Sequence, residues 1–148
     1  MQNSGFERSD IWREGAWLDL WSVVHLLSGT STGLGFYFLH FGALPSVVIA
    51  LLSFILYETW EMLVGIKETS TNRFMDVVVD MASFLPAFFI LAPALSATQL
   101  VLVFGLVFVV NSILGALGWR ASQKAAALEK RLRARYALHR ARLAERGR

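Results

Sequence analysis

Long apolar stretches alternate with short polar connections along most of the chain. Crossing a lipid bilayer takes about 20 predominantly apolar residues in a helix. Four stretches approach or exceed that length and are predicted spans, at residues 17–41, 44–63, 76–92 and 97–119. The third is short unless its acidic start lies within the bilayer. The pattern predicts an all-α polytopic membrane protein whose transmembrane part is a four-helix bundle.

The composition supports a membrane location and excludes several kinds of site. The chain has 148 residues, of which 55% are hydrophobic, and its mean hydropathy is +0.52. These values are too apolar for a soluble domain of this size. The absence of cysteine excludes disulfides, thiolate metal sites and cysteine nucleophiles. The sequence also contains no Gly-rich phosphate loop, Ser-His-Asp arrangement or zinc motif.

The charges predict the orientation in the membrane. Every Lys and Arg lies at the N-terminus, in the connection 64–75 or in the tail 120–148, which a four-span topology places on one side. Cytoplasmic loops carry the excess of Lys and Arg, so both termini are expected in the cytoplasm, at a bacterial inner membrane. All five Trp fall on the same side, as in an interfacial belt. The polar segment 1–16 lacks the apolar region of a cleavable signal peptide.

The C-terminal residues 120–148 are predicted to form a basic amphipathic helix on the cytoplasmic side. A narrow apolar stripe recurs at spacings of three and four, formed by Ala125, Leu128, Leu132, Tyr136, His139 and Leu143. Such a helix could lie on anionic lipid, or it could pair with a membrane protein partner or a second copy of the chain. Nucleic-acid binding is the least favoured of these uses, because Arg-rich charge alone is weak evidence for it.

Chemistry concentrates near the cytoplasmic end of the predicted bundle. Polar side chains fall at a similar depth in all four spans: Asp19 and His25 in the first, Glu58 and Glu61 in the second, Asp76 and Asp80 in the third, and Asn111 in the fourth. The two Glu are spaced i,i+3 and the two Asp i,i+4, so each pair shares a helix face. The pairs could therefore converge, with Asp19 and Asn111 in supporting positions.

Three chemistries fit this cluster. Glu58, Glu61, Asp76 and Asp80 could hold a divalent cation, and His25 could complete a transition-metal site. The carboxylates could instead share protons and serve as general acid and base or as a relay. In the third interpretation they are structural: they pair with His25, Lys67 and Arg73 and cap helix ends, with Asp76 favoured by the helix dipole.

Small residues predict two close helix contacts. Gly29 and Gly33 follow His25 at intervals of four, so the three share one face of the first span. The fourth span has a similar stripe, made by Gly105, Ser112 and Gly115. Membrane helices approach closely where such residues line up.

These residues resemble the VanZ-like family of small bacterial membrane proteins over about residues 17–85. The family pattern has an Asp and a His entering an early span, Glu-x-x-Gln ending another, and Arg…Asp-x-x-x-Asn opening the next. The chain has Asp19 and His25, then Glu58-x-x-Glu61, then Arg73-x-x-Asp76-x-x-x-Asp80. It departs from the pattern with Glu61 for Gln, Asp80 for Asn and a longer Asp-to-His spacing. The resemblance implies a helical inner-membrane protein, in some members linked to lipoglycopeptide resistance.

The leading functional hypothesis is a site for a cation or a lipid headgroup at the acidic cluster. The acids would hold the cation or relay protons, and Arg73 would pair with a phosphate or carboxylate. The first alternative is an accessory or assembly subunit of a larger membrane complex. The second is a membrane-embedded hydrolase or transferase acting on a lipid-linked substrate.

Overall fold

The computed structural model describes residues 11–12, 15, 17–64, 66 and 69–146, with side chains as far as His139. Most of the predicted N-terminal segment and Lys67 lie outside the described residues. All regular structure within them is helical, which confirms the predicted all-α class. In chain order the elements are α1 (Leu20–Phe38), α2 (Ala43–Leu63), α3 (Ser70–Pro86), the π-helical turn η1 (Ala87–Leu91), α4 (Ala92–Ala94) and α5 (Ala97–Arg146).

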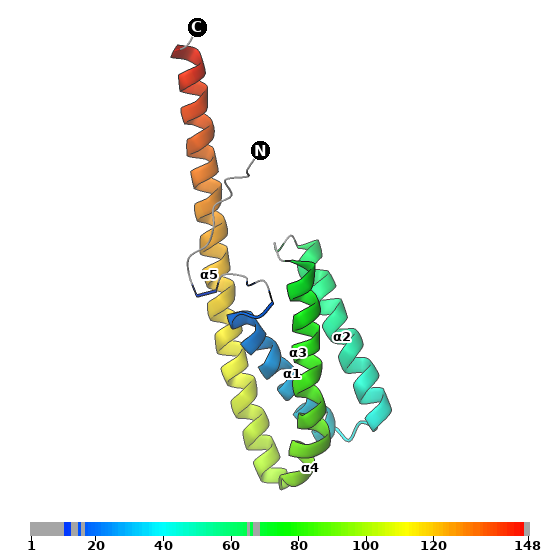
Figure 1. The fold of residues 1–148 in the computed structure, drawn as a ribbon. Coiled ribbons are helices and arrows are strands. Elements are labelled where there is room, and N and C mark those ends of the chain that lie inside the picture. The colour runs from blue at the N-terminus through cyan, green and yellow to red at the C-terminus, as the bar shows by residue number, and fades with distance from the viewer. Residues whose placement is uncertain (1–10, 13–14, 16, 65, 67–68, 147–148) are drawn as a thin grey trace.

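The central element is α1, which packs against α2, α3, η1, α4 and α5. α1 and α3 run in one direction, while α2 and α5 run in the other (Figure 1). The start of α1, the α2–α3 connection and the C-terminal half of α5 consequently lie toward one end of the molecule. The α1–α2 and α4–α5 connections lie at the other end (Figure 1).

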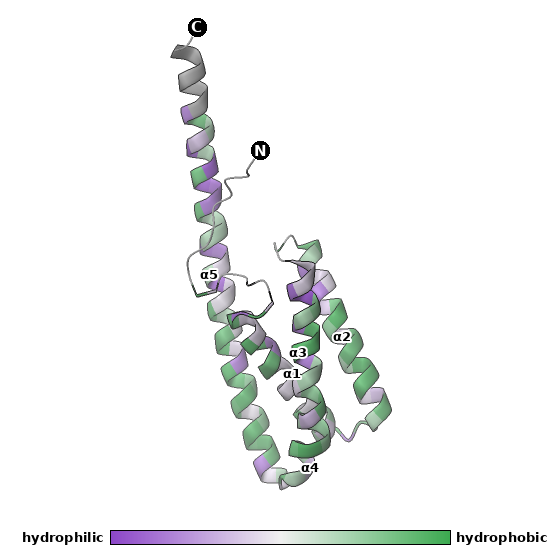
Figure 2. Ribbon diagram, in the orientation of Figure 1, coloured by the Kyte–Doolittle hydropathy of each residue, from purple (hydrophilic) through white to green (hydrophobic). Residues whose placement is uncertain are grey.

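Within the described residues, three helices are long and apolar enough to cross a membrane. They are α2, the continuous rod Ser70–Ala94 formed by α3, η1 and α4, and α5 as far as His139. Figure 2 shows hydrophobic residues along α2 and the first half of α5, whereas hydrophilic residues gather in its second half. α1 is not among the three, because its Ser, Thr, Gly and His residues lower its hydropathy. Because α1 lies among the other helices, several of these polar side chains are buried.

The first helix begins later than the predicted span because of its N-cap. Asp19 accepts hydrogen bonds from the backbone N–H groups of Trp21 and Ser22, at 2.7 and 3.3 Å. The Ser22 hydroxyl in turn accepts from the N–H of Asp19, which completes a capping box. Asp19 therefore starts α1 at Leu20.

The third helix begins at Ser70, well before Asp76. The side chain of Thr69 caps it by accepting a hydrogen bond from the N–H of Asn72 at 3.1 Å. The predicted span, residues 76–92, covered only the apolar part of a longer helix. Asp76 thus lies inside α3, beyond the first turn where a helix dipole acts, which corrects the interpretation of Asp76 as an N-terminal carboxylate.

α1 and α3 approach each other closely at Gly29 and Gly33, as the first of the two glycine stripes predicted. A Cβ at Gly33 would lie 2.7 Å from the carbonyl oxygen of Phe84, and one at Gly29 would overlap the carbonyl oxygen of Asp80. Beyond this crossing lie buried Phe84, near the end of α3, and buried Phe88 in η1, whose rings stack at a centroid distance of 5.8 Å. The helix then widens into η1 after Pro86, which lacks the N–H that would continue the α-helical pattern.

The second predicted stripe does not form a close contact. A Cβ on Gly105 would meet nothing within 4 Å among the described residues, and one on Gly115 would only touch Val24 at 3.9 Å. The tight position on α5 is Gly118, where a Cβ would lie 2.6 Å from the ring of Trp12. Bulky aromatic side chains, rather than a second helix backbone, therefore fill the space that this glycine leaves.

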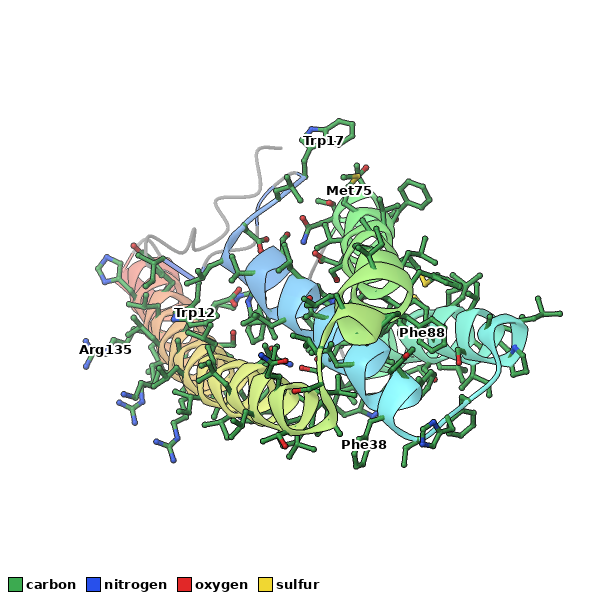
Figure 3. All side chains as sticks on the ribbon, turned by 90° about the horizontal axis from the view of Figure 1, so that it is seen from below. Trp12, Trp17, Phe38, Met75, Phe88 and Arg135 are labelled. Atoms are coloured by element: carbon green, nitrogen blue, oxygen red, sulfur yellow. The ribbon has the colours of Figure 1, made fainter. Side chains whose placement is uncertain are left out.

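α5 runs without interruption from the fourth predicted span into the basic C-terminal segment. Figure 3 shows Trp17 and Arg135 pointing away from the helices, whereas Phe88 lies among them. Leu128, Tyr136 and Leu138 on the basic part are between 47% and 70% exposed. No described part of the chain covers these side chains, so the surface of this part of α5 is exposed.

The α1–α2 connection contains a backbone conformation that suits glycine better than its actual residue. His40 has a φ of 57° and donates its N–H to the carbonyl of Tyr37 at 3.0 Å. The left-handed region costs an ordinary residue about 1–2 kcal/mol, and β-branched residues fit it worst. We expect His40→Val to lower the free energy of unfolding by about that amount and His40→Gly to preserve it. Thermal unfolding in detergent measures both, and equal midpoints would contradict the prediction.

Candidate metal site at the buried acidic cluster

A series of polar contacts joins the N-terminal parts of α1 and α3, the ends that are predicted to face the cytoplasm. The amide of Asn72 donates to Asp19 Oδ2 at 3.3 Å, and one turn later the Ser22 hydroxyl donates to Asp76 Oδ1 at 3.1 Å. The next step places His25 Nδ1 2.9 Å from Asp80 Oδ2. Because the two helices are parallel, residues spaced by three or four on each meet in order along the interface.

His25 stands at the centre of three carboxylates. Besides the Asp80 contact at Nδ1, its Nε2 lies 3.6 Å from Glu58 Oε1 and 3.9 Å from Asp76 Oδ2. Glu58 comes from α2, so three helices contribute. The Tyr57 ring lies edge-on to the imidazole at a centroid distance of 6.0 Å. The face of α1 that approaches α3 through Gly29 thus begins with a histidine surrounded by acids.

The cluster is buried. Exposed fractions are 6% for His25 and Glu58, 1% for Asp76 and 2% for Asp80. Oδ1 of Asp80 is buried and accepts no hydrogen bond from any residue in the described part of the chain. Burying several carboxylates together is costly unless cations or protons compensate their charge. One imidazole carries at most one positive charge against the three acids that face it.

Three of these side chains have the arrangement of metal ligands. His25, Glu58 and Asp76 each offer one donor atom, and the three atoms lie within 4.8 Å of one another. Separations of 3.6 and 3.9 Å from Nε2 are too long for hydrogen bonds. Ligands of one metal ion stand about 2.0–2.2 Å from it, so small side-chain rotations would bring these atoms into a shared coordination shell.

The other predicted site residues lie around this core. Glu61 is half-buried and accepts a side-chain hydrogen bond from Tyr57, one turn before it on α2. Asp19 caps α1 and reaches the cluster through Asn72. Asn111 donates to the Ser28 hydroxyl at 2.9 Å, which ties α5 to α1 rather than extending the acidic cluster.

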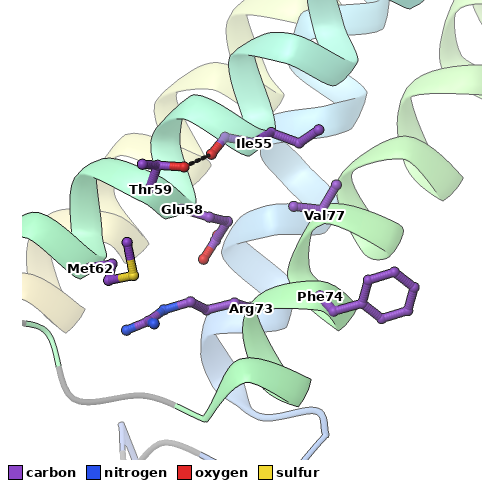
Figure 4. A pocket seen from close by; sticks show the side chains of 7 residues that line it. All are labelled: Ile55, Glu58, Thr59, Met62, Arg73, Phe74 and Val77. Atoms are coloured by element: carbon purple, nitrogen blue, oxygen red, sulfur yellow. Dashed lines mark hydrogen bonds between the residues drawn. The ribbon is translucent and has the colours of Figure 1, made fainter.

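A shallow groove between α2 and α3 lies beside the cluster. Its cavity volume is about 200 Å³, and it is lined by Ile55, Glu58, Thr59, Met62, Arg73, Phe74 and Val77. Figure 4 shows the side chains of Glu58 and Arg73 extending into the space between the two helices. The Arg73 guanidinium donates to the carbonyl of Ile66 at 2.9 Å. The groove connects one acid of the cluster to the outer surface of the bundle.

Sequence reasoning missed Asn72, the most buried polar residue of the interface. Its amide bridges Asp19 and Asp76, with the Asp76 contact at 3.2 Å. The prediction had placed it in a loop. Two signals could have found it: it lies four residues before Asp76, on the same helix face, and three residues after the capping residue Thr69.

Comparison with known proteins gave no match to a protein-family model, to a curated protein or to a solved structure. The resemblance to the VanZ-like family therefore stays a prediction from the residues that carry it.

Proposed function

We propose that the chain is an integral membrane protein that binds a divalent metal cation between α1, α2 and α3. The observation that carries the proposal is the convergence of His25, Glu58 and Asp76 from three different helices, with donor atoms within 4.8 Å of one another. Two carboxylates and an imidazole are a common ligand set for divalent metals. A bound ion would join the three helices at one end of the bundle.

The electrostatics of the cluster favour a cation over a purely structural role. Glu58, Asp76 and Asp80 are each at least 94% buried and all face the same imidazole. In surroundings of low dielectric constant, carboxylates in contact repel one another strongly. A divalent cation would cancel that repulsion, and its ligands would exchange unfavourable contacts for metal–oxygen bonds.

Within a membrane, the proposed arrangement has four spans with both termini in the cytoplasm of a bacterial cell. Lys and Arg gather at the end of the bundle that holds the acidic cluster, as the positive-inside rule requires. Trp17, Trp60 and Trp119 are 63%, 48% and 45% exposed, as aromatic side chains of an interfacial belt would be. The basic half of α5 would then contact anionic lipid on the cytoplasmic face.

Elemental analysis of the protein purified in mild detergent from native membranes tests the proposal. We expect about one equivalent of a divalent metal per chain, because three protein ligands suffice to retain such an ion. The double variant Glu58→Gln, Asp76→Asn removes two charged ligands while keeping side-chain size. Its metal content should fall at least tenfold, since changes even outside the ligand shell cost about 10–100-fold in affinity.

Glu61→Gln is the matched control, because Glu61 lies on α2 one turn beyond Glu58 and is directed to Tyr57. It should retain the metal. Equal metal content in the double variant and the control would show the proposal to be wrong. A lipid that is retained in place of a metal, and lost in the double variant, would assign the cluster to a headgroup instead.

A further inference from the structure

The two ring nitrogens of His25 differ in their surroundings, because Asp80 contacts Nδ1 only. An ionised carboxylate only accepts hydrogen bonds, so the 2.9 Å contact with Asp80 places a proton on Nδ1. In the neutral imidazole, the form that binds a metal, the lone pair is then on Nε2. Nε2 makes no hydrogen bond with the residues that the structure describes, although His25 is 94% buried. The lone pair is directed at the space between Glu58 and Asp76.

Hydrogen bonds from neighbouring side chains fix the orientation of two of the three donor residues, His25 and Asp76. Metal-binding histidines characteristically donate their other ring N–H to a carboxylate, which sets the tautomer and the ring orientation. Asp80 fills that role for His25. Asp76 is fixed in the same way, because Ser22 donates to Oδ1 at 3.1 Å and the Asn72 amide donates to Oδ2 at 3.2 Å.

The nitrogen donor determines which ions suit the site. Mg²⁺ and Ca²⁺ are hard cations that take almost only oxygen ligands and keep or recruit water. Imidazole suits first-row transition ions, and a mixed set with carboxylates suits Mn²⁺, Fe²⁺ and Zn²⁺. Resting on the proposed function, we infer that the site selects a first-row transition ion over Mg²⁺ and Ca²⁺ through Nε2 of His25, with Asp80 as the positioning residue.

Electron paramagnetic resonance with Mn²⁺ as the probe tests the inference on the full chain, stripped with chelator in detergent. Pulsed spectra of the wild-type complex should show ¹⁴N modulation from one imidazole. Zn²⁺ should displace Mn²⁺, as its higher place in the affinity series requires, whereas about a hundredfold excess of Mg²⁺ should not. The wild-type spectrum reports the nitrogen ligand directly, even where a variant fails to fold.

Two variants separate the ligand from the positioning residue. His25→Gln should abolish the ¹⁴N modulation and weaken Mn²⁺ binding at least tenfold. Asp80→Asn should keep the modulation but weaken binding by about 10–100-fold, as the loss of a carboxylate that orients a metal-binding histidine does. Glu61→Gln should behave as wild type in both measurements.

The outcomes distinguish this inference from the proposed function. Mn²⁺ bound without ¹⁴N modulation, or displaced equally by Mg²⁺, would overturn the selection for transition ions while leaving a cation site. Unchanged affinity in Asp80→Asn would overturn the positioning role. If none of Mn²⁺, Zn²⁺, Mg²⁺ and Ca²⁺ binds the folded protein, the proposed function itself is wrong.

Discussion

Replacing Gly29 by alanine is expected to lower the free energy of unfolding by about 3 kcal/mol, because the added methyl group overpacks the α1–α3 crossing. The new Cβ would overlap the backbone carbonyl of Asp80 and the hydroxyl of Ser83. A backbone carbonyl inside a helix cannot rotate away, so the two helices would have to separate. His25 lies one turn from Gly29, and Asp80 lies at the contact itself. The two would move apart with the helices, and the affinity of the proposed metal site should fall as well.

Gly105→Ala is the matched control for this prediction. Gly105 lies in the N-terminal part of α5, past its first turns, and a Cβ there meets nothing within 4 Å among the described residues. Alanine is the better helix former by about 1 kcal/mol, so this variant should be neutral or slightly stabilised. Unfolding of both variants by heat or SDS in micelles gives the comparison. Equal stability of the two would mean that α1 and α3 do not cross as closely as the structure shows.

The second large effect is expected for His25→Leu in the metal-free protein. Leucine fills much of the space but leaves Glu58, Asp76 and Asp80 facing one another without the imidazole. Removing one partner of a buried ion pair typically costs about 3–5 kcal/mol, and we expect a loss of that size in denaturant unfolding after chelation. His40→Gln is the control, because His40 is exposed on the α1–α2 connection.

A double variant sharpens this test. In His25→Leu, Asp80→Leu both members of the 2.9 Å contact are replaced by apolar side chains. Replacing a whole buried pair is often nearly neutral, so the double variant should recover most of the stability that His25→Leu loses. A double variant less stable than the single one would show that the Asp80 carboxylate stabilises the fold through other contacts.

The boundaries of some helices could be predicted from the sequence more accurately than those of others. The predicted span 44–63 nearly coincides with α2, because in this helix the apolar run is as long as the helix itself. The third span was predicted to start at Asp76, and α3 starts at Ser70. Hydropathy detects only the apolar part of a helix. The first turns of α3 are polar, and the helix begins there because Thr69 caps it.

The two glycine stripes show the limit of local patterns. Both have the spacing of a close helix contact, but only Gly29 and Gly33 meet a second backbone. Gly105 faces open space, because α5 meets the rest of the bundle along another face. Spacing shows that small residues share a face, and the neighbouring helix decides whether anything occupies it.

The sequence by itself determined the helical class, the basic end and the residues from which the cluster is drawn. These properties are local: apolar length, charge distribution and i,i+4 spacing depend on residues close together in the chain. Only the tertiary structure decided the partners. Asp80 meets His25 across 55 residues of sequence and Asn72 meets Asp19 across 53. Glu61 instead accepts from Tyr57, and Asn111 donates to Ser28. Such pairings depend on which helices pack together and in what register, and both are set by the contact of Gly29 and Gly33 with α3.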